Sequence, residues 1–416
     1  MAIIEGAPSL DGTAGLLELF EPARRSDPYP GYERLRSTHP IWQPLEGLFV
    51  ITRHQDCLAV LRDARFGHSE GGELGFFSPG DAEGAATRYE PRLRSFLGLN
   101  PPDHTRLRRL VSRSFTPRRV EELGPFIEAL TADLVAAAKA GPAPVDLVQA
   151  VASPLPVTVI SELLGVPADD RERLVGWSHD LGRGLEPGFL VPDDERGRQV
   201  RARAELESYW RQLAAERRRK PGEDLLSALV SAHDQGDALN EDELVATCHL
   251  LLIAGHETTT SLIGNGALAL LRHPGQLARL RQEPGLVARA VEEMLRYDAP
   301  VQLTFRAALT DADIGGVEVP KGSFVLVLVG AANRDPGAHP EPDVLDIERP
   351  PAPNLAFGQG VHFCIGAPLA RLEAQLAFRS LMREAGDLHL AGEPVWKDNT
   401  VLRGLSHLPV TLQLAS

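Results

Sequence analysis

Residues 356–366 read AFGQGVHFCIG, and this short stretch decides how the rest of the chain is interpreted. It holds Cys364, one of only three cysteines, with His362 two positions before it. A lone buried cysteine is usually an inert small hydrophobe. Here glycines surround it, and Gly358 and Gly360 allow a positive φ or a close approach of the backbone. The stretch therefore predicts a turn folded beneath a flat ligand.

A helix is predicted directly after the cysteine. The segment APLARLEAQLAF places Leu369, Leu372 and Leu376 on one stripe, and it tolerates Pro368 in the first turn. A sulfur at a helix N-terminus meets unpaired amides and the positive end of the helix dipole, which stabilise a thiolate and lower its pKa. A metal is the natural partner of such a sulfur. Because no other ligands stand nearby, we expect the metal to be held by a macrocycle.

The charge balance argues against nucleic acid as the main partner. The chain of 416 residues has 43 Lys and Arg against 57 Asp and Glu, which gives a net charge of −14. Binding to phosphates needs a basic surface, which such a chain does not offer overall. Hydrophobic residues make up 43% of the sequence, so a sizeable core is expected and global disorder is not.

The cysteines and the apolar runs indicate the compartment. Cys57, Cys248 and Cys364 are far apart and form no C-x-x-C pair, which disfavours a disulfide framework or a zinc site. The first residues carry no basic segment typical of a signal or transit peptide. The longest apolar runs are far too short to span a membrane. We therefore expect a soluble protein of the reducing cytoplasm, with no membrane partner.

The periodicity of the chain predicts a mainly α protein with a smaller β portion. Helical patterns cover 103–120, 121–139, 145–164, 199–219 and 284–297, and the segment 182–197 interrupts them with Gly and Pro. Strands are expected in a hairpin at 40–52 and over 310–330. The glycine-rich stretch 67–100 is either a binding loop or lid over a site, or a plain surface excursion.

A long helix is predicted from Asn240 to the residue before Pro274. An Asn at the N-cap and Glu243 three residues later can satisfy two orphan amides, and about thirty residues would span on the order of 45 Å. The middle reads LLLIAGHETTTSL. Gly255 inside the helix costs roughly 1 kcal/mol relative to Ala, and the hydroxyl of Thr258 can compete for the carbonyl of Ala254. This is either a tolerated weakness or a small groove for a diatomic ligand or water.

The pattern F-G-x-G-x-H-x-C-x-G, from Phe357 to Gly366, resembles the haem-binding signature of the cytochrome P450 monooxygenases. A-G-x-[DE]-T at 254–258 and E-x-x-R at 293–296 match two further motifs of the family, and the resemblance covers about 60–380. It is closest to soluble actinobacterial members, many of which tailor polyketides and other secondary metabolites. It implies one P450 domain over 1–416 without a fused reductase, expected to be a monomer. The implied fold is a helix-rich prism with haem b between the long central helix and the cysteine loop.

The resemblance assigns the chemistry to both sides of the haem. Cys364 becomes the axial ligand of the iron, and Glu257 and Thr258 support proton delivery while dioxygen, the cosubstrate, is activated. His256 is expected to face away from the groove. The residues implied to contact the haem or the oxygen pocket are His104, Arg108, Ala254, Gly255, Arg306, Phe357, His362, Cys364 and Gly366.

The haem propionates need charged donors where they are partly removed from water. His104 and Arg108 are four residues apart and share one helix face, a pattern that also fits a basic solvated helix. The resemblance favours the first interpretation and assigns the propionates to these two residues together with Arg306 and His362. Arg109 and Arg113 lie on the opposite side of the helix and are expected to face solvent near the thiolate, where a ferredoxin could dock.

The pair Glu293 and Arg296 is an ordinary i, i+3 helix ion pair by spacing. In the family an arginine later in the chain completes a buried network, and Arg349 stands where that arginine is expected. We interpret the three residues as structural, holding the cysteine loop.

The substrate wall is implied only by family positions. The residues there are mainly apolar, which indicates a mid-sized lipophilic substrate. The predicted wall consists of Phe76, Phe77, Leu251, Ile253, Ala254, Val301, Leu303 and Leu402.

The implied reaction inserts one oxygen atom into a C–H or C=C bond of a polyketide or macrolide, terpenoid, steroid or fatty-acid-like compound, while the other atom leaves as water. Haem performs the difficult chemistry and the protein positions the substrate. Electrons are expected from NAD(P)H through a ferredoxin reductase and a ferredoxin. Two alternatives stay open: a peroxygenase driven by hydrogen peroxide, and a haem sensor or carrier without catalysis.

Overall fold

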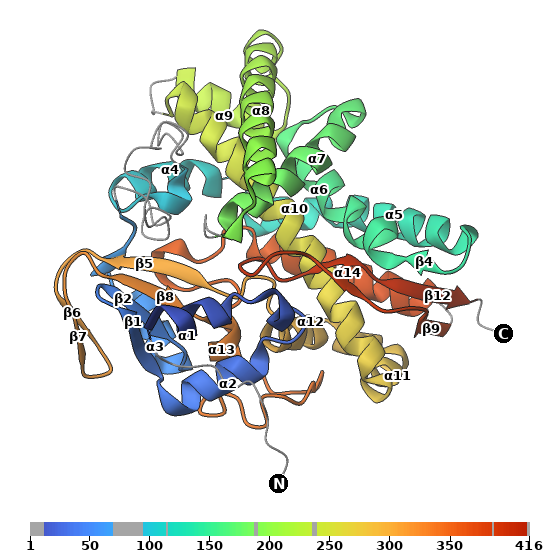
Figure 1. Cartoon of the computed structure of the whole chain (residues 1–416). Coiled ribbons are helices and arrows are strands. Elements are labelled where there is room, and N and C mark those ends of the chain that lie inside the picture. Colours follow the sequence, from blue (N-terminus) through green and yellow to red (C-terminus); the bar gives the residue numbers. More distant parts are fainter. Residues whose placement is uncertain are drawn as a thin grey trace.

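In the computed structural model, helix α10 (Glu241–Arg272) passes through the middle of the molecule and the other large helices surround it (Figure 1). The structure describes residues 12–69, 95–113, 115–186, 190–234, 239–384 and 387–413. Of the 32 residues of α10, 22 are buried. Burial over most of its surface identifies this helix as the centre of the core, and the predicted mainly α architecture is confirmed.

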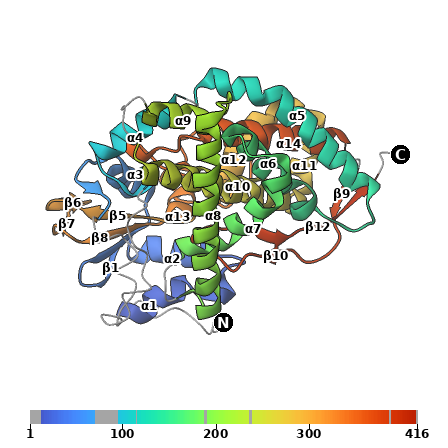
Figure 2. The same ribbon diagram turned by 90° about the horizontal axis from the view of Figure 1, so that it is seen from above.

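The helices around α10 share its hydrophobic core. Helices α6, α7, α8, α12 and α14 contact it directly, and in the view from above α8 crosses it at a steep angle (Figure 2). The further α-helices are α1 (Gly12–Leu19), α2 (Tyr29–Thr38), α3 (His54–Arg62), α4 (Asp103–Ser112), α5 (Pro117–Ala140), α6 (Pro154–Leu164), α7 (Arg171–Gly182), α8 (Asp193–Arg219), α9 (Leu225–Asp234), α11 (Pro274–Gln282), α12 (Val287–Tyr297), α13 (Val329–Asn333) and α14 (Ala367–Glu384).

The start of α10 follows the predicted capping box. The side chain of Asn240 accepts a hydrogen bond of 2.8 Å from the amide of Glu243, and the Glu243 carboxylate accepts one of 2.9 Å from the amide of Asn240. Two orphan amides are thereby satisfied. The helix ends before Pro274, where the sequence predicted its end.

The strands form two groups in Figure 1: the main sheet lies on the left, and β4, β9 and β12 lie on the right beside α5 and α14. The main described sheet has the order β1-β2-β8-β5-β3, in which β2 and β8 are parallel and the other neighbours antiparallel. The predicted hairpin turns at Glu46 and Gly47, with a φ of 75° at the glycine. The strands are β1 (Ile41–Leu45), β2 (Leu48–Ile51), β3 (Phe66–Gly67), β4 (Val145–Asp146), β5 (Thr304–Ala308), β6 (Ala312–Ile314), β7 (Val317–Val319), β8 (Phe324–Val327), β9 (Asp387–Leu390), β10 (Val395–Trp396), β11 (Leu405–His407) and β12 (Pro409–Gln413).

Three predicted helix boundaries are wrong. The helical pattern from 103 breaks after Ser112, because Thr116 caps a new helix that begins at Pro117. At 145–164 the first two residues instead pair with β12, and a π-helical turn (Val148–Ala152) precedes α6. Helix α8 begins at Asp193 rather than 199, and Asp193, Asp194 and Glu195 occupy its first turn, where acidic side chains suit the dipole.

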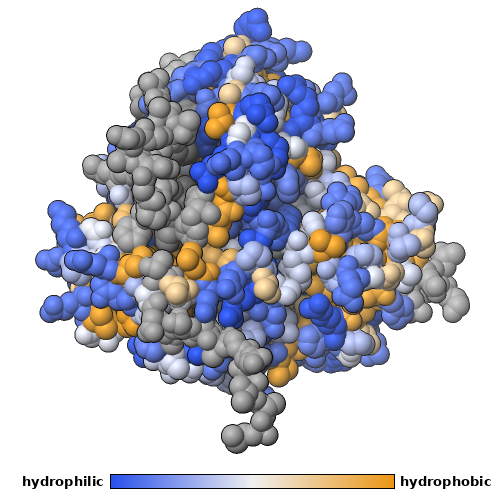
Figure 3. Space-filling model, in the orientation of Figure 1, coloured by the Kyte–Doolittle hydropathy of each residue, from blue (hydrophilic) through white to orange (hydrophobic). Residues whose placement is uncertain are grey.

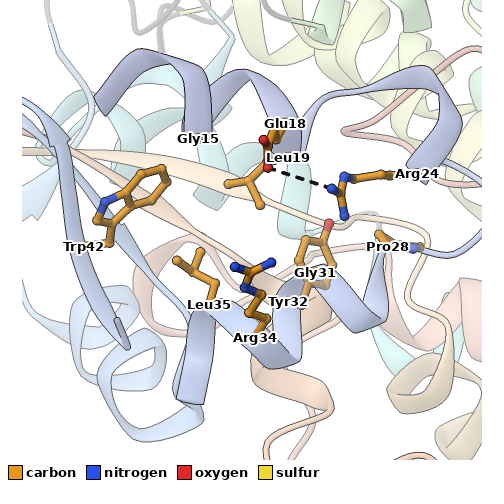
Figure 4. A pocket seen from close by; sticks show the side chains of 10 residues that line it. All are labelled: Gly15, Glu18, Leu19, Arg24, Pro28, Gly31, Tyr32, Arg34, Leu35 and Trp42. Atoms are coloured by element: carbon orange, nitrogen blue, oxygen red, sulfur yellow. Dashed lines mark ion pairs between the residues drawn. The ribbon is translucent and has the colours of Figure 1, made fainter. Parts of the chain in front are cut away.

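The N-terminal segment closes against α2 and β1. Tyr32, Leu35 and Trp42 surround a cavity of about 20 Å³, and Glu18 lies 3.8 Å from Arg24 at its rim (Figure 4). That volume holds about one water molecule, so this pocket is far too small for a substrate. Over the upper part of the molecule, where α8 projects, the surface is mostly hydrophilic (Figure 3).

Candidate active site

The cysteine segment is a tight turn that leads into α14. Gly358 and Gly360 have φ values of 66° and 71°, and the amide of Cys364 donates a 2.9 Å hydrogen bond to the carbonyl of Phe357. A Cβ at Gly360 would lie 2.3 Å from the carbonyl oxygen of Leu61 at the end of α3. The turn thus needs glycine at position 360 both for its conformation and for its contact with α3.

Arg108 holds this turn from α4. Its Nη1 donates a 3.0 Å hydrogen bond to the carbonyl of Val361, and its Nη2 donates to that of Phe363. Two of the five guanidinium N–H donors are therefore used on the backbone of the turn. The propionate contact expected of Arg108 stays a prediction, while its contact with the turn is an additional role that the sequence did not indicate.

The thiol of Cys364 shows a balance of opposing effects. Burial raises its pKa, whereas the amides of Gly366 and Ala367 and the charges of Arg108 and Arg371 lower it. The net direction is upward, so the pKa lowering predicted from the sequence is wrong for the thiol by itself. The reason is that loss of hydration outweighs the helix N-terminus. A thiol that coordinates a metal ion is deprotonated outright, and the arrangement suits that use.

Three imidazoles gather beside the turn. The ring of His362 lies 4.6 Å from that of His68 and 4.3 Å from that of His104. His104 is only 2% exposed, and within the described part of the chain neither of its ring nitrogens has a hydrogen-bond partner. Burial, with the charge of Arg108, lowers the pKa of His104 to about 4. His68 was not predicted, because a single histidine before a glycine-rich stretch carries no motif.

The predicted propionate residues converge on His362. Burial, followed by His68, Arg306, His104 and Arg108, lowers the pKa of His362 to about 2. Arg306 is itself buried on β5, where its Nη1 donates a 2.7 Å hydrogen bond to the carbonyl of Phe305. A buried cluster of cationic and imidazole groups stabilises an anion placed among them.

One face of α10 is open in the middle of this otherwise buried helix. Ala254 is exposed, and Leu250, Ile253, Gly255 and Thr258 are half-buried, which at this spacing forms a stripe. The hydroxyl of Thr258 donates a 2.6 Å hydrogen bond to the carbonyl of Ala254, as the sequence analysis expected.

The substrate side of α10 differs in part from the predicted one. Leu251 is 5% exposed and packs in the main hydrophobic core, whereas Ile253 is half-buried. Leu250, one turn before Ala254, is half-buried on the same face of the helix. Burial depends on what packs against the helix, which its own sequence does not state.

Glu257 forms a buried ion pair that no motif indicated. Its Oε2 lies 2.6 Å from Nζ of Lys397, and the two side chains are 6% and 11% exposed. Burial raises the pKa of Glu257, but Lys397 and His256 lower it, and the net pKa is below its usual value. His256 lies between the hydroxyls of Ser153 and Ser178, at 3.2 and 3.0 Å.

Glu293, Arg296 and Arg349 form the expected network. Arg296 donates to both carboxylate oxygens of Glu293 at 2.7 and 2.8 Å, and Arg349 donates to the same carboxylate at 3.2 Å. Arg296 also donates to the carbonyl of Asn333, whose side chain accepts from the amide of Leu355 just before the cysteine segment. The network therefore reaches the turn that it was predicted to support.

These features match a known family. The family model described as Cytochrome P450 matches residues 72–385. The chain belongs to the cytochrome P450 family. It is 44% identical over 396 residues to the cytochrome P450 monooxygenase PikC of Streptomyces venezuelae, which covers 92% of this chain and 91% of PikC. It is 40% identical over 405 residues to 6-deoxyerythronolide B hydroxylase of Saccharopolyspora erythraea, covering 93% and 96%.

Solved P450 structures have the same fold. The ligand-free CYP164A2 of Mycobacterium smegmatis superposes with a TM-score of 0.87 at 44% identity, covering 95% of this chain and 99% of that one. The vitamin D(3) 25-hydroxylase of Pseudonocardia autotrophica is a further relative, 41% identical over 403 residues, covering 95% and 96%. Relatives of this kind are named monooxygenases and hydroxylases, so this P450 is a haem-thiolate monooxygenase.

The residues of this P450 fit a haem. His104 keeps two buried ring nitrogens that have no hydrogen-bond partner among the described residues, and the cluster around His362 suits carboxylates. Cys364 is half-buried at the start of α14, and Ala254 is exposed on α10. In the described part of the chain, no three His, Cys, Asp or Glu side chains form another metal site. Among the described helices, none is long and apolar enough to cross a membrane.

The predicted substrate wall of this P450 is partly assembled. Val301 pairs with Leu402 as an isolated bridge, and the amide of Gln302 donates a 3.0 Å hydrogen bond to the carbonyl of Val401. Leu303 and Leu402 are 2% and 3% exposed. Segments about a hundred residues apart are thus brought together as expected. Phe76 and Phe77 lie outside the described residues.

Proposed function

We propose that this P450 hydroxylates or epoxidises a mid-sized lipophilic molecule of the macrolide or polyketide type. The observation that carries the proposal is the open face of α10, where Thr258 stands beside an exposed Ala254 and a buried acid, Glu257. The identity to PikC and to 6-deoxyerythronolide B hydroxylase supports the substrate class. Terpenoids, steroids and fatty acids are the other substrates to be screened.

The chain contributes binding, orientation and proton control. Haem held by Cys364 would supply the oxidation chemistry, because thiolate ligation favours cleavage of the O–O bond. His104, Arg306 and His362 would bind the propionates. The hydroxyl of Thr258 holds and moves protons at the groove, and the buried carboxylate of Glu257, one residue before it, supplies them from a different side of α10. Apolar residues such as Ile253, Val301 and Leu402 hold the substrate and exclude water.

The reaction needs two electrons and two protons for each substrate molecule. One oxygen atom enters the substrate as a hydroxyl or epoxide oxygen, and the other leaves as water. The electrons come from NAD(P)H through a ferredoxin reductase and a ferredoxin. Arg109 and Arg113 are exposed on α4, and Val361 and Phe363 at the cysteine turn are 55% and 36% exposed. Exposed cations and apolar residues together suit an acidic docking partner.

Charge reversal tests this docking surface. The double variant R109E/R113E is expected to reduce the rate of haem reduction by ferredoxin roughly tenfold at low salt, because steering acts mainly on association rates. Haem content and substrate binding should stay unchanged. An unaltered reduction rate in stopped-flow mixing would contradict the docking site.

The carbon monoxide difference spectrum of the reduced protein tests the proposed chemistry. A strongly red-shifted Soret band requires a thiolate ligand, and the band should disappear in Cys364→His while haem is retained. Its persistence in that variant would overturn the assignment. Product with ferredoxin, reductase and NAD(P)H supports the proposal. Product only with hydrogen peroxide indicates a peroxygenase, and substrate binding without turnover indicates a sensor.

We further propose one P450 domain over 1–416, acting as a monomer in the cytoplasm. Cys57, Cys248 and Cys364 are all free thiols, which suits a reducing compartment. Size-exclusion chromatography with light scattering tests the monomer, and a mass near 90 kDa would contradict it because one chain weighs 45.1 kDa.

A further inference from the structure

Lys397, the partner of Glu257, is placed by a hairpin that lies along α10. It follows β10, and its amide donates a 2.9 Å hydrogen bond to the carbonyl of Gly404 on the opposite strand. A Cβ at Gly404 would stand 2.1 Å from Oγ of Ser261, so the hairpin backbone touches the helix. Asn265 then donates a 3.1 Å hydrogen bond to the carbonyl of Arg403.

These contacts occur at a regular helical spacing. Glu257, Ser261 and Asn265 are four residues apart, and such residues lie one above another on a helix face. The hairpin therefore covers three successive turns of α10, and the first of them is the turn that carries the acid. Arg403 adds a second anchor, because its Nε donates a 2.6 Å hydrogen bond to Asp298 and its guanidinium stacks 3.8 Å from the ring centre of Trp396.

A polar pocket borders the ion pair of Glu257 and Lys397. Its volume is about 310 Å³, and Glu257 and Lys397 contribute to its wall with His179 of α7, Arg198 of α8 and Asp398 of the hairpin. His179, Arg198 and Asp398 are exposed, so the pocket reaches solvent. The pocket therefore has room for several waters.

The acid and the alcohol point in different directions. Consecutive helical residues project about 100° apart, so Glu257 and Thr258 cannot face the same point. Thr258 donates to Ala254 at the open face, whereas the side chain of Glu257 packs near Gly182 of α7 and borders the polar pocket.

We propose that Lys397 is a positioning residue for Glu257, which it holds ionised and directed into the polar pocket, so that the acid takes up protons from solvent there. The inference rests on the proposed monooxygenase function, since it concerns how the acid of that reaction is supplied. Lys397 itself touches neither substrate nor haem. The ammonium of Lys397 fixes the position of the Glu257 carboxylate between turnovers.

The electrostatics give the direction of the effect. Burial raises the pKa of Glu257, and Lys397, by its charge and its hydrogen bond, is the main group that opposes burial. Without the ammonium, burial prevails and the pKa rises. The charged and titratable groups around the acid and its pocket are His256 on α10, His179, Asp180 and Arg183 at α7, Glu195 and Arg198 on α8, and Lys397 and Asp398 on the hairpin.

The test compares Lys397→Met with Lys397→Arg in the haem-loaded resting enzyme. Infrared spectroscopy across pH follows the protonated carboxyl band, and Glu257→Gln identifies which band belongs to Glu257. In Lys397→Met the midpoint should rise by at least about one pH unit, a tenfold change in the ionisation constant. In Lys397→Arg it should stay in place, because the charge is kept. Lys397→Gln replaces the Met variant if that one does not retain haem.

Turnover supplies the second readout. In Lys397→Met the pH dependence of the turnover number kcat should move upward with the infrared midpoint, while KM stays unchanged because the substrate wall is intact. An unmoved infrared midpoint, or a moved midpoint with an unmoved pH–rate profile, would overturn the positioning role. Failure of the proposed function is distinct from both: the wild-type protein would lack the thiolate carbon monoxide band or form no product with its redox partners.

Discussion

The cysteine turn and the acid of α10 serve the same reaction but are built in opposite ways. The turn is local: Cys364 bonds to Phe357 seven residues away, and Gly358 and Gly360 give it its shape. The acid depends on a partner 140 residues further along the chain, Lys397. The comparison teaches that a sequence motif indicates the geometry of a short segment, whereas the partners that contact the segment from elsewhere in the chain cannot be identified from the motif.

The largest expected effect comes from a substitution in the cysteine turn, the locally built region. Gly360→Ala should abolish stable haem binding, because its Cβ would lie 2.3 Å from the backbone oxygen of Leu61. Gly358→Ala is the matched control: its φ is also positive, but the nearest atom to the new Cβ is 3.8 Å away. It should cost only the strain of a left-handed residue, roughly 1–2 kcal/mol. Soret absorbance per protein and the thermal midpoint measure both; equal haem loss in the two variants would show that strain, not contact, decides.

The next effect concerns the network that supports the turn from a distance. Arg296→Met leaves the buried carboxylate of Glu293 with Arg349 as its remaining cation and removes three bonds to backbone carbonyls. We expect a loss of about 3 kcal/mol of unfolding free energy, at the lower end for a broken buried pair because Arg349 remains. The half-buried Arg279 on α11, which pairs with Glu283 and Glu348, is the control when it is replaced by Met. A loss equally small in both variants would mean that the network does not stabilise the fold.

The sequence could predict most of the fold because short-range sequence patterns specify α10 and α14. The capping box at Asn240 and Glu243, and the stripe after Cys364, are short-range patterns with a physical cause. One of the boundaries that failed was set by a distant partner. Val145 pairs with β12 from the far end of the chain, and no property of the local sequence specifies that pairing.

The same distinction between local motifs and long-range contacts applies to the residues of the candidate site. The turn, the hydroxyl of Thr258 on Ala254 and the Glu293 network were predicted from motifs. Lys397 and His68 were not, since their roles arise from tertiary contacts. The pKa of Cys364 was predicted in the wrong direction because the helix N-terminus is visible in the sequence, whereas the burial that outweighs it is not.

The smallest expected effect concerns Thr258, the residue that follows the acid Glu257 on α10. Thr258→Val keeps the side-chain volume and removes the hydroxyl that donates to Ala254. Product formed per NAD(P)H consumed should fall about tenfold, equivalent to about 1.4 kcal/mol, with the missing electrons recovered as hydrogen peroxide. Thr258→Ser should retain coupling, because the hydroxyl is what carries the proton.

The neighbouring Thr259 supplies the matched control for this last change. It is 2% exposed on α10 and lies off the open face, so Thr259→Val removes a hydroxyl from the same helix without touching the groove. Coupling should stay at the wild-type level there. Equal uncoupling in Thr258→Val and Thr259→Val would mean that helix α10 as a whole, and not the groove at Thr258, controls proton delivery. The contrast between a local turn and an acid positioned at long range would then no longer explain how the roles are divided.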